Sequence, residues 1–209
     1  MIVWYNNNVR YKRVSQDKER EVIKVSTTFP GTTIETTSLE KGSSKNLFDG
    51  IFAAGGITLS QVSIMTGLEP YMIQNWVKRG FVTSPVKRVY SKEQFARIVI
   101  INMLKESLQI EKICGLIKII GGDPNDRSDD LINDDVLYHK YVDMISGNDI
   151  NISDAKSVVA AAQNAVADMK VRSSTEKKTL MSILQVMLYA HAASKIRALA
   201  DEILISLDH

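Results

Sequence analysis

Cysteine is scarce in this chain, because Cys114 is the single cysteine among 209 residues. No disulfide can therefore form within the chain, and the start of the sequence has no basic and then apolar leader of the secretory kind. The three histidines, His139, His191 and His209, are scattered, and no pair of Cys or His residues has the spacing of zinc ligands. We expect a cytoplasmic protein that holds no metal and no cofactor.

Long hydrophobic runs and catalytic constellations are also missing. The most apolar stretch, Leu180 to Leu207, is interrupted by polar and charged side chains, which predicts a buried or paired helix and excludes a membrane span. Cys114 lies in the apolar run ICGLI, which is typical of a core position. Because the three histidines are scattered and Cys114 is assigned to the core, we expect that the protein is not an enzyme.

Charge is unevenly distributed although the formal net charge is only +2. Residues 57–120 hold nine basic and four acidic side chains, a net charge of +5, whereas residues 121–150 hold two basic and eight acidic ones, a net charge of −6. A basic segment of this kind favours a polyanionic partner, and a plain solvated face is the alternative.

The acidic segment contains a spacing that resembles a calcium loop. Asp123, Asn125, Asp129 and Asp134 have suitable side chains, but Arg127 occupies a ligand position and the glycine that such a loop requires is absent. The interpretation that we favour is capping of helix ends by these residues.

Three regions are predicted along the chain. Residues 1–45 form a poorly ordered or extended segment, with a short hairpin around Asn6–Asn8 and a Thr-, Ser- and Gly-rich linker over 26–44. Residues 46–122 form the first helical domain, and residues 123–209 form an acidic loop followed by more helices. The fold class is therefore mainly α.

Helix boundaries can be predicted from capping residues and apolar periodicity. Thr58 with Gln61, and Ser91 with Gln94, have the spacing of capping boxes, while Pro70 suits the first turn of a helix. The helix after Ser91 is apolar over most of its circumference, so it should be the central one. The expected helices are 46–54, 58–66, 70–80, one from Ser91, 110–120, 131–146 with a break at Asn133, 153–171 and 174–207.

Several motifs carry a family resemblance. The amino-terminal domain of MerR-type regulators is resembled over residues 57–120 by ITLSQVSIMTGL, by the helix that ends at Gly80 and Phe81, and by KRVYSKEQFARIVIINMLKESLQIEKICGLI. The resemblance implies a winged helix-turn-helix, in which the second helix enters the DNA major groove and the wing touches the backbone. MIQNWVKRG, with the later SDD and LYHKY, is more closely similar to a bacterial family of uncharacterised MerR-like proteins, a domain of unknown function, up to about residue 146.

Candidate DNA-binding residues follow from this layout. Trp76 lies on the apolar face of its helix and is assigned to the core in preference to base stacking. The other face carries side chains that can pair with bases or phosphates, and the wing carries two more cations, of which Arg88 matches the wing arginine of the MerR pattern. The candidates are Tyr71, Gln74, Asn75, Lys78, Arg79, Lys87 and Arg88.

The functional prediction is a transcriptional regulator that binds double-stranded DNA. The alternative is a protein-interaction module that keeps the helix-turn-helix fold, because Tyr71 and Gln74 stand where MerR regulators commonly have arginines and Asn75 replaces a tyrosine. The helix over 174–207 is long enough to pack both internally and against a second copy, which predicts a homodimer; a monomeric bundle with the 153–171 helix is the alternative. The sequence does not identify an effector.

Overall fold

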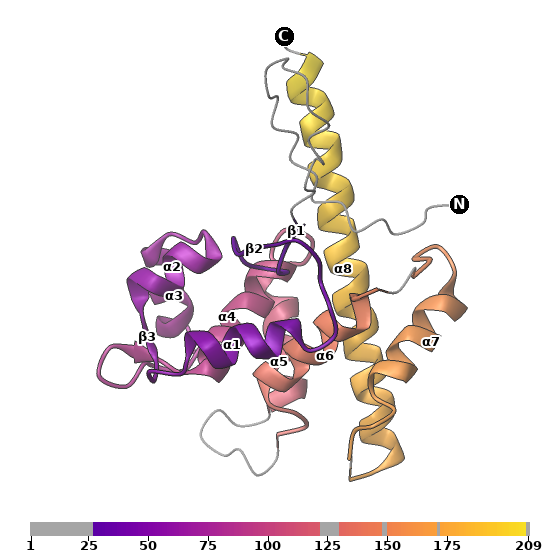
Figure 1. Ribbon diagram of the computed structural model, residues 1–209, viewed down its shortest axis with the longest axis horizontal. Coiled ribbons are helices and arrows are strands. Elements are labelled where there is room, and N and C mark those ends of the chain that lie inside the picture. The colour runs from indigo at the N-terminus through magenta and orange to yellow at the C-terminus, as the bar shows by residue number, and fades with distance from the viewer. Residues whose placement is uncertain (1–26, 122–129, 148–149, 171, 208–209) are drawn as a thin grey trace, which may run out of the picture.

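A computed structural model describes residues 27–121, 130–147, 150–170 and 172–207, which are mainly helical (Figure 1). The described helices are α1 (Ser43–Ile51), α2 (Leu59–Thr66), α3 (Pro70–Lys78), α4 (Lys92–Leu104), α5 (Ile110–Gly121), α6 (Asp134–Ile145), α7 (Ala155–Ala165) and α8 (Ser174–Leu207). Two antiparallel ribbons complete this part of the chain, one of β1 (Thr27–Thr28) with β2 (Glu35–Thr36) and one of β3 (Ile57–Thr58) with β4 (Val89–Tyr90).

Helix α4 lies at the centre of the core, as its apolar circumference predicts. It contacts α2, α5, α6 and α8, and nine of its thirteen residues are buried. Phe95, Ile98 and Leu104 are among the most completely buried side chains of the described residues. A helix that is buried on several faces needs apolar residues on all of them, which explains why its sequence lacks a polar stripe.

The two predicted capping boxes are confirmed. The backbone amide of Thr58 donates to Oε1 of Gln61 at 2.8 Å, and that of Ser91 donates to Oε1 of Gln94 at 2.8 Å. In each box the Thr or Ser hydroxyl accepts in turn from the backbone amide of the glutamine. These reciprocal bonds satisfy amides that the first turn of a helix leaves free, so α2 and α4 begin where their sequences indicate.

Other boundaries differ from the predicted ones. Helix α6 begins at Asp134, with Asn133 as its N-cap, so the expected break is the helix start. Helix α7 ends at Ala165 and not near residue 171, because Ala167 and Met169 close tight turns on Asn164 and Val166. Helix α8 has its expected bounds.

The prediction of an extended linker over 26–44 is wrong for the described residues of that range. Phe29 and Leu39 are buried, and the Thr33 hydroxyl donates to the Ile64 carbonyl at 2.7 Å. From α4, the side-chain amide of Asn102 donates to the Gly31 carbonyl at 2.9 Å. The β1–β2 hairpin and α1, which begins three residues earlier than expected, are therefore part of the folded body, while residues 1–26 and their predicted hairpin lie outside the described part.

Helices α6, α7 and α8 share one hydrophobic core with the preceding elements. Helix α6 packs on α1 and α4, and its Tyr138 hydroxyl donates to the Pro30 carbonyl at 2.9 Å. Tyr141 hydrogen bonds through its hydroxyl to Nδ1 of His191 on α8 at 2.7 Å. The buried residues form a continuous cluster from Phe29 to Ala190, so the boundary predicted at residue 122 does not separate two cores.

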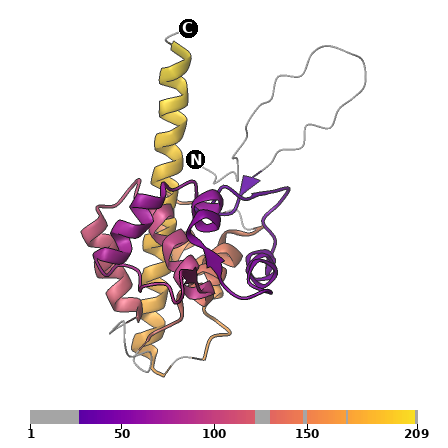
Figure 2. The same ribbon diagram turned by 90° about the vertical axis from the view of Figure 1, so that its left-hand side faces the viewer.

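Helix α8 crosses the body and then extends well beyond it (Figures 1 and 2). Its buried residues lie between Leu180 and Ala192, whereas every residue of 196–207 is exposed. None of the helices in the described ranges, α8 included, combines the length and the apolar character needed to cross a membrane.

Candidate nucleic-acid interface

Helices α2 and α3 are joined by a turn of three residues that is closely hydrogen bonded. Gly67 has a φ of +69°, and Pro70 occupies the first turn of α3, where no amide bond is lost. The Ser63 hydroxyl donates to the Leu68 carbonyl at 2.6 Å, and Oγ1 of Thr66 accepts from the Leu68 amide at 3.3 Å. The turn therefore fixes the position of α3 relative to α2.

Helix α3 has the buried face and the exposed face that the sequence predicts. Ile73 and Trp76 are buried, which confirms the assignment of Trp76 to the core. The candidate residues of this helix, Tyr71, Gln74, Asn75 and Lys78, are all exposed. Tyr71 is 68% exposed although it is aromatic, so it contributes little to the core.

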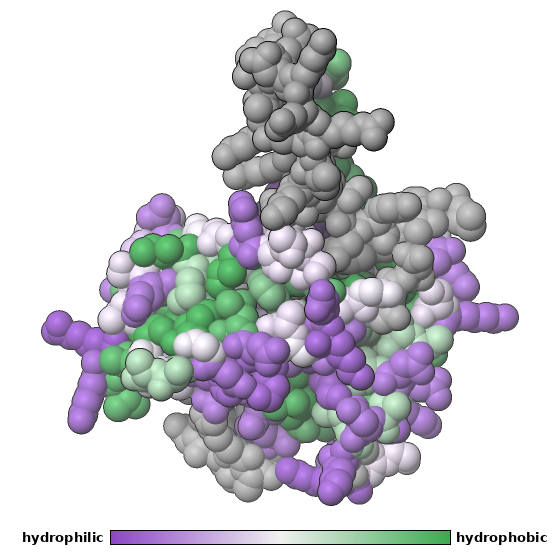
Figure 3. All heavy atoms as spheres, viewed as in Figure 1, coloured by the Kyte–Doolittle hydropathy of each residue, from purple (hydrophilic) through white to green (hydrophobic). Residues whose placement is uncertain are grey.

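The connector from α3 to α4 contains a hairpin turn with an unusual backbone. Val86 and Val89 form an antiparallel bridge, and the Val89 amide donates to the Val86 carbonyl at 2.9 Å. Between them, Lys87 and Arg88 have φ values of +50° and +64°. Two successive positive φ angles define a type I′ turn, a position where Asn and Gly are normally found. Figure 3 shows hydrophilic side chains extending from the left edge of the molecule, where this loop lies in Figure 1.

Gln94 holds the base of this connector, and sequence reasoning had given it a capping role alone. Its side-chain nitrogen donates to the Thr83 carbonyl at 2.9 Å, to the Thr83 hydroxyl at 2.9 Å and to the Ser84 carbonyl at 3.0 Å. The residue is only 9% exposed, so these bonds are shielded from water. A capping glutamine in the sequence marks the helix start, but nothing in the sequence shows which loop its amide group contacts.

A close backbone approach keeps the β3–β4 ribbon in register. A Cβ atom on Gly56 would lie 2.2 Å from Cγ1 of Val89 and 2.5 Å from the Tyr90 carbonyl oxygen. Only glycine leaves room for β4 at this point. Because the register pairs Ile57 with Tyr90, Gly56 helps to place the turn that carries Lys87 and Arg88.

The four candidate cations differ in their surroundings. Arg79 lies over the Phe81 ring, 4.5 Å from its centroid, and forms an ion pair with Glu111 at 3.5 Å. Among the described residues, the side chains of Lys78, Lys87 and Arg88 have neither an ion-pair nor a hydrogen-bond partner. Three cations are thus available to an external anion at this end of the molecule, whereas Arg79 would first have to leave Glu111.

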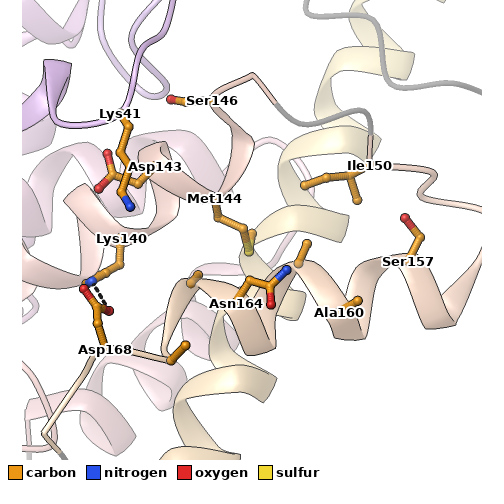
Figure 4. Close-up of a pocket in the computed structure, with 13 residues that line it drawn as sticks. Lys41, Lys140, Asp143, Met144, Ser146, Ile150, Ser157, Ala160, Asn164 and Asp168 are labelled. Atoms are coloured by element: carbon orange, nitrogen blue, oxygen red, sulfur yellow. Dashed lines mark hydrogen bonds and ion pairs between the residues drawn. The ribbon is translucent and has the colours of Figure 1, made fainter.

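A concave region lies between α6 and α7 (Figure 4), with a volume of about 700 Å³. Three of its four charged side chains have partners: Lys140 pairs with Asp168 at 2.6 Å, and Asp143 accepts from the Gly42 amide at 2.7 Å. Lys41 also lines the cavity. The sequence analysis had not indicated this region.

Asp134, in the acidic segment, takes part in a buried ion pair. Oδ2 of Asp134 accepts from Nε of Arg97 at 2.9 Å, and burial raises the pKa of this carboxyl while Arg97 opposes the rise. The other members of the calcium-like spacing, Asp123, Asn125 and Asp129, lie outside the described residues. Within the described ranges no group of three His, Cys, Asp or Glu side chains could hold a metal ion.

Comparison with known families gives one match. The family described as Domain of unknown function (DUF1836) matches residues 57–141. No curated protein and no solved structure matches the chain. The expected relation to an uncharacterised family is confirmed for these residues. The part of the chain from β3 into α6 is therefore similar to a DUF1836 domain.

Proposed function

We propose that residues 57–104 form a MerR-like winged helix-turn-helix that binds double-stranded DNA, and that the protein regulates transcription. The observation that carries the proposal is the turn of Lys87 and Arg88 at the tip of the β3–β4 hairpin, beside a helix whose exposed face is polar. In this proposal α3 is the recognition helix and the hairpin is the wing.

Helix α3 has the dimensions that groove recognition needs. A helix with its side chains is about 10–12 Å across, and the major groove of B-DNA is about 12 Å wide. Gln74 and Asn75 are exposed, and their side-chain amides can each donate to and accept from an adenine edge. Tyr71 would lie on the same exposed side and offers a hydroxyl and a ring.

The cations at this end would contact phosphates. Lys78 ends α3, and Lys87 and Arg88 lie at the tip of the wing, so phosphates on either side of a groove could be reached. Such contacts fix the orientation of a protein on the duplex without reading its sequence. Arg79 is the weakest of the candidates, because its contact would cost the interactions with Glu111 and Phe81.

The strained turn supports a functional role for its two side chains. A residue with a Cβ atom pays about 1–2 kcal/mol to adopt the left-handed region, and here two such residues adopt it in succession. An Asn-Gly pair would form the same turn at lower cost. Strain of this kind is often found where side chains act on a ligand, and two adjacent cations are suited to phosphates.

One observation favours the alternative, a protein-interaction module with the same fold. Ile64 on α2, Tyr71 on α3 and Val86 beside the turn are 71%, 68% and 74% exposed. A protein partner that covered these apolar side chains would be held mainly by hydrophobic contact, and its binding would depend only weakly on salt.

Charge reversal at the wing tip tests the proposal. Arg88→Glu keeps a side chain with a Cβ atom at the same backbone position, so the turn carries similar strain in both proteins. Loss of one charged contact, worth about 1.5–3 kcal/mol, should weaken binding to mixed genomic DNA fragments at least tenfold. It should also lower the slope of log affinity against log salt by about one.

The matched control is Lys156→Glu, which makes the same charge change at an exposed residue of α7. We expect this variant to bind DNA nearly as the wild type does. If Arg88→Glu retains a native circular dichroism spectrum and binds DNA with unchanged affinity and salt slope, the DNA-binding proposal fails and the protein-interaction module takes its place.

A further inference from the structure

The exposed side of α3 carries a stripe of four side chains at helical spacing. Positions i, i+3, i+4 and i+7 of a helix lie on one side of it. In α3 these positions are all exposed, and they hold Tyr71, Gln74, Asn75 and Lys78. This set, called the α3 stripe below, begins with an aromatic ring, has two side-chain amides at its centre and ends with an ammonium group.

The two amides at the centre of the α3 stripe take no part in holding the fold. Five Gln and Asn side chains lie between the start of β3 and the end of α4. Three of them are hydrogen bonded within the protein, namely Gln61, Gln94 and Asn102. The side chains of Gln74 and Asn75 have no hydrogen-bond partner among the described residues. Their donors and acceptors are therefore available to a ligand.

The α3 stripe contains no arginine, which is the side chain that most often pairs with the O6 and N7 acceptors of guanine. The next residue along the chain, Arg79, is held by Glu111 and by the Phe81 ring. A side-chain amide suits adenine instead, because its nitrogen donates to N7 of the base while its oxygen accepts from the N6 amino group. The centre of the stripe thus carries groups that match adenine.

Tyr71 places an apolar ring beside these amides. The residue is 68% exposed and precedes Gln74 and Asn75 by one helical turn. Thymine presents a methyl group in the major groove, where apolar side chains can contact it. From Tyr71 to Asn75 the helix rises about 6 Å at 1.5 Å per residue, and successive base pairs are about 3.4 Å apart. For a helix that lies along the groove, these contacts fall within about two base-pair steps.

We propose that the α3 stripe selects consecutive A·T base pairs, with Gln74 and Asn75 pairing with adenines and Tyr71 contacting the methyl group of a thymine. This inference rests on the proposed function, because it names the class of duplex that the same site binds. The selection is a major-groove selection, since N7 of adenine and the methyl group of thymine are displayed in that groove. A preference for a narrow minor groove would not depend on either group.

The first test compares two pools of duplexes of equal length, about 20 base pairs, by fluorescence anisotropy at about 50 mM salt. The central positions are random A·T pairs in one pool and random G·C pairs in the other. The wild-type protein should bind the A·T pool at least fivefold more tightly. Equal affinity for the two pools would overturn this inference and leave the proposed function standing, whereas absence of binding to both pools would overturn the two together.

The second test removes single major-groove groups from the A·T pool and uses only the wild-type protein. Replacement of adenine by 7-deazaadenine removes N7, and replacement of thymine by uracil removes the methyl group, while Watson–Crick pairing is kept. The affinity should fall at least fivefold with 7-deazaadenine and about fourfold with uracil. A preference for A·T pairs that survives both replacements would come from the minor groove or from the shape of the duplex, and would overturn the inference.

The third test removes the two amides from the protein. Gln74→Ala with Asn75→Ala should abolish the preference for the A·T pool and keep the salt slope, because no charge changes. The matched control is Gln163→Ala with Asn164→Ala, the same pair at exposed positions of α7, which lies at the opposite edge of the molecule in Figure 1 and should keep the wild-type preference. Gln74→Arg should move the preference towards the G·C pool. An α3 double variant with native circular dichroism and an unchanged preference would overturn the inference.

Discussion

The turn of Lys87 and Arg88 allows a double substitution in which stability and DNA affinity should change in opposite directions. Lys87→Asn with Arg88→Gly replaces the two residues by the pair that a type I′ turn normally contains. At position 88 the change relieves about 1–2 kcal/mol of left-handed strain, and the greater freedom of glycine in the unfolded chain takes back about 0.5–1 kcal/mol. Asparagine at position 87 relieves part of the strain without that loss.

The free energy of unfolding should therefore rise by about 1 kcal/mol, because the turn has no buried contact to lose at these two exposed side chains. In a chain of 209 residues this corresponds to an increase of about 2–4 °C in Tm. Urea denaturation and a thermal melt would measure both quantities. The same variant loses two cations at the proposed wing tip, so its log-log salt slope for DNA should decrease by about 1.8.

The control for the binding measurement is Lys156→Asn with Lys178→Asn, which removes two exposed cations elsewhere. This control should keep a salt slope close to that of the wild type. A turn variant that is less stable than the wild type would refute the strain argument, and a more stable variant with an unchanged salt slope would refute the phosphate contacts.

Three further predictions concern the elements that hold the β3–β4 hairpin and the core. Gln94→Glu keeps the acceptor for the Ser91 amide but removes the donor that the Thr83 carbonyl, the Thr83 hydroxyl and the Ser84 carbonyl share. The free energy of unfolding, measured in urea, should therefore fall by about 1–3 kcal/mol. An unchanged free energy of unfolding would mean that these bonds do not stabilise the connector. Gly56→Ala should destabilise the protein, since the new Cβ would lie 2.2 Å from Cγ1 of Val89. The control is Gly115→Ala in α5, where the new Cβ meets nothing within 4 Å, so this variant should be neutral or more stable by up to about 1 kcal/mol. Equal effects of the two substitutions on stability would contradict the close approach of Gly56 to β4. Burial lowers the pKa of His191 to about 3, below its value of about 6.5 in the unfolded chain. Below pH 6.5 the unfolded chain therefore binds a proton that the folded protein does not bind. The free energy of unfolding is highest above pH 6.5 and decreases as the pH falls towards 3. Between pH 7 and 5 this loss is about 2 kcal/mol, and His191→Gln should show a correspondingly shallower pH dependence in urea denaturation; parallel curves would contradict it.

The sequence was sufficient for features that depend on neighbouring residues. Thr58 with Gln61 and Ser91 with Gln94 form their helix starts through bonds that span three residues, so the motif contains all the participants. The apolar character of α4 likewise indicated its central position. The burial of Trp76 followed from its place on one face of a short amphipathic helix.

Features that depend on distant residues could not be obtained in this way. The β1–β2 hairpin is held by a bond from Thr33 to Ile64 of α2 and by a bond from Asn102 of α4 to Gly31. The first bond joins residues that are 31 positions apart in the sequence, and the second joins residues that are 71 positions apart. The Thr-rich sequence of the hairpin alone suggests a linker. The positive φ angles of Lys87 and Arg88 contradict local preference, because neither residue favours the left-handed region. The pairing of Arg79 with Glu111 depends on how α5 packs near the end of α3, which separates this arginine from the other candidate cations.

The proposed binding of DNA by α3 and the β3–β4 hairpin, through phosphates and base edges, can be measured on the wild-type protein. Binding to mixed genomic duplex fragments should be measured by fluorescence anisotropy between 50 and 300 mM salt. With Lys78, Lys87 and Arg88 each neutralising one phosphate, we expect a slope of log affinity against log salt of about −2.7 per bound chain. Absence of binding at the lowest salt, or binding whose affinity does not change with salt, would contradict the proposed phosphate contacts.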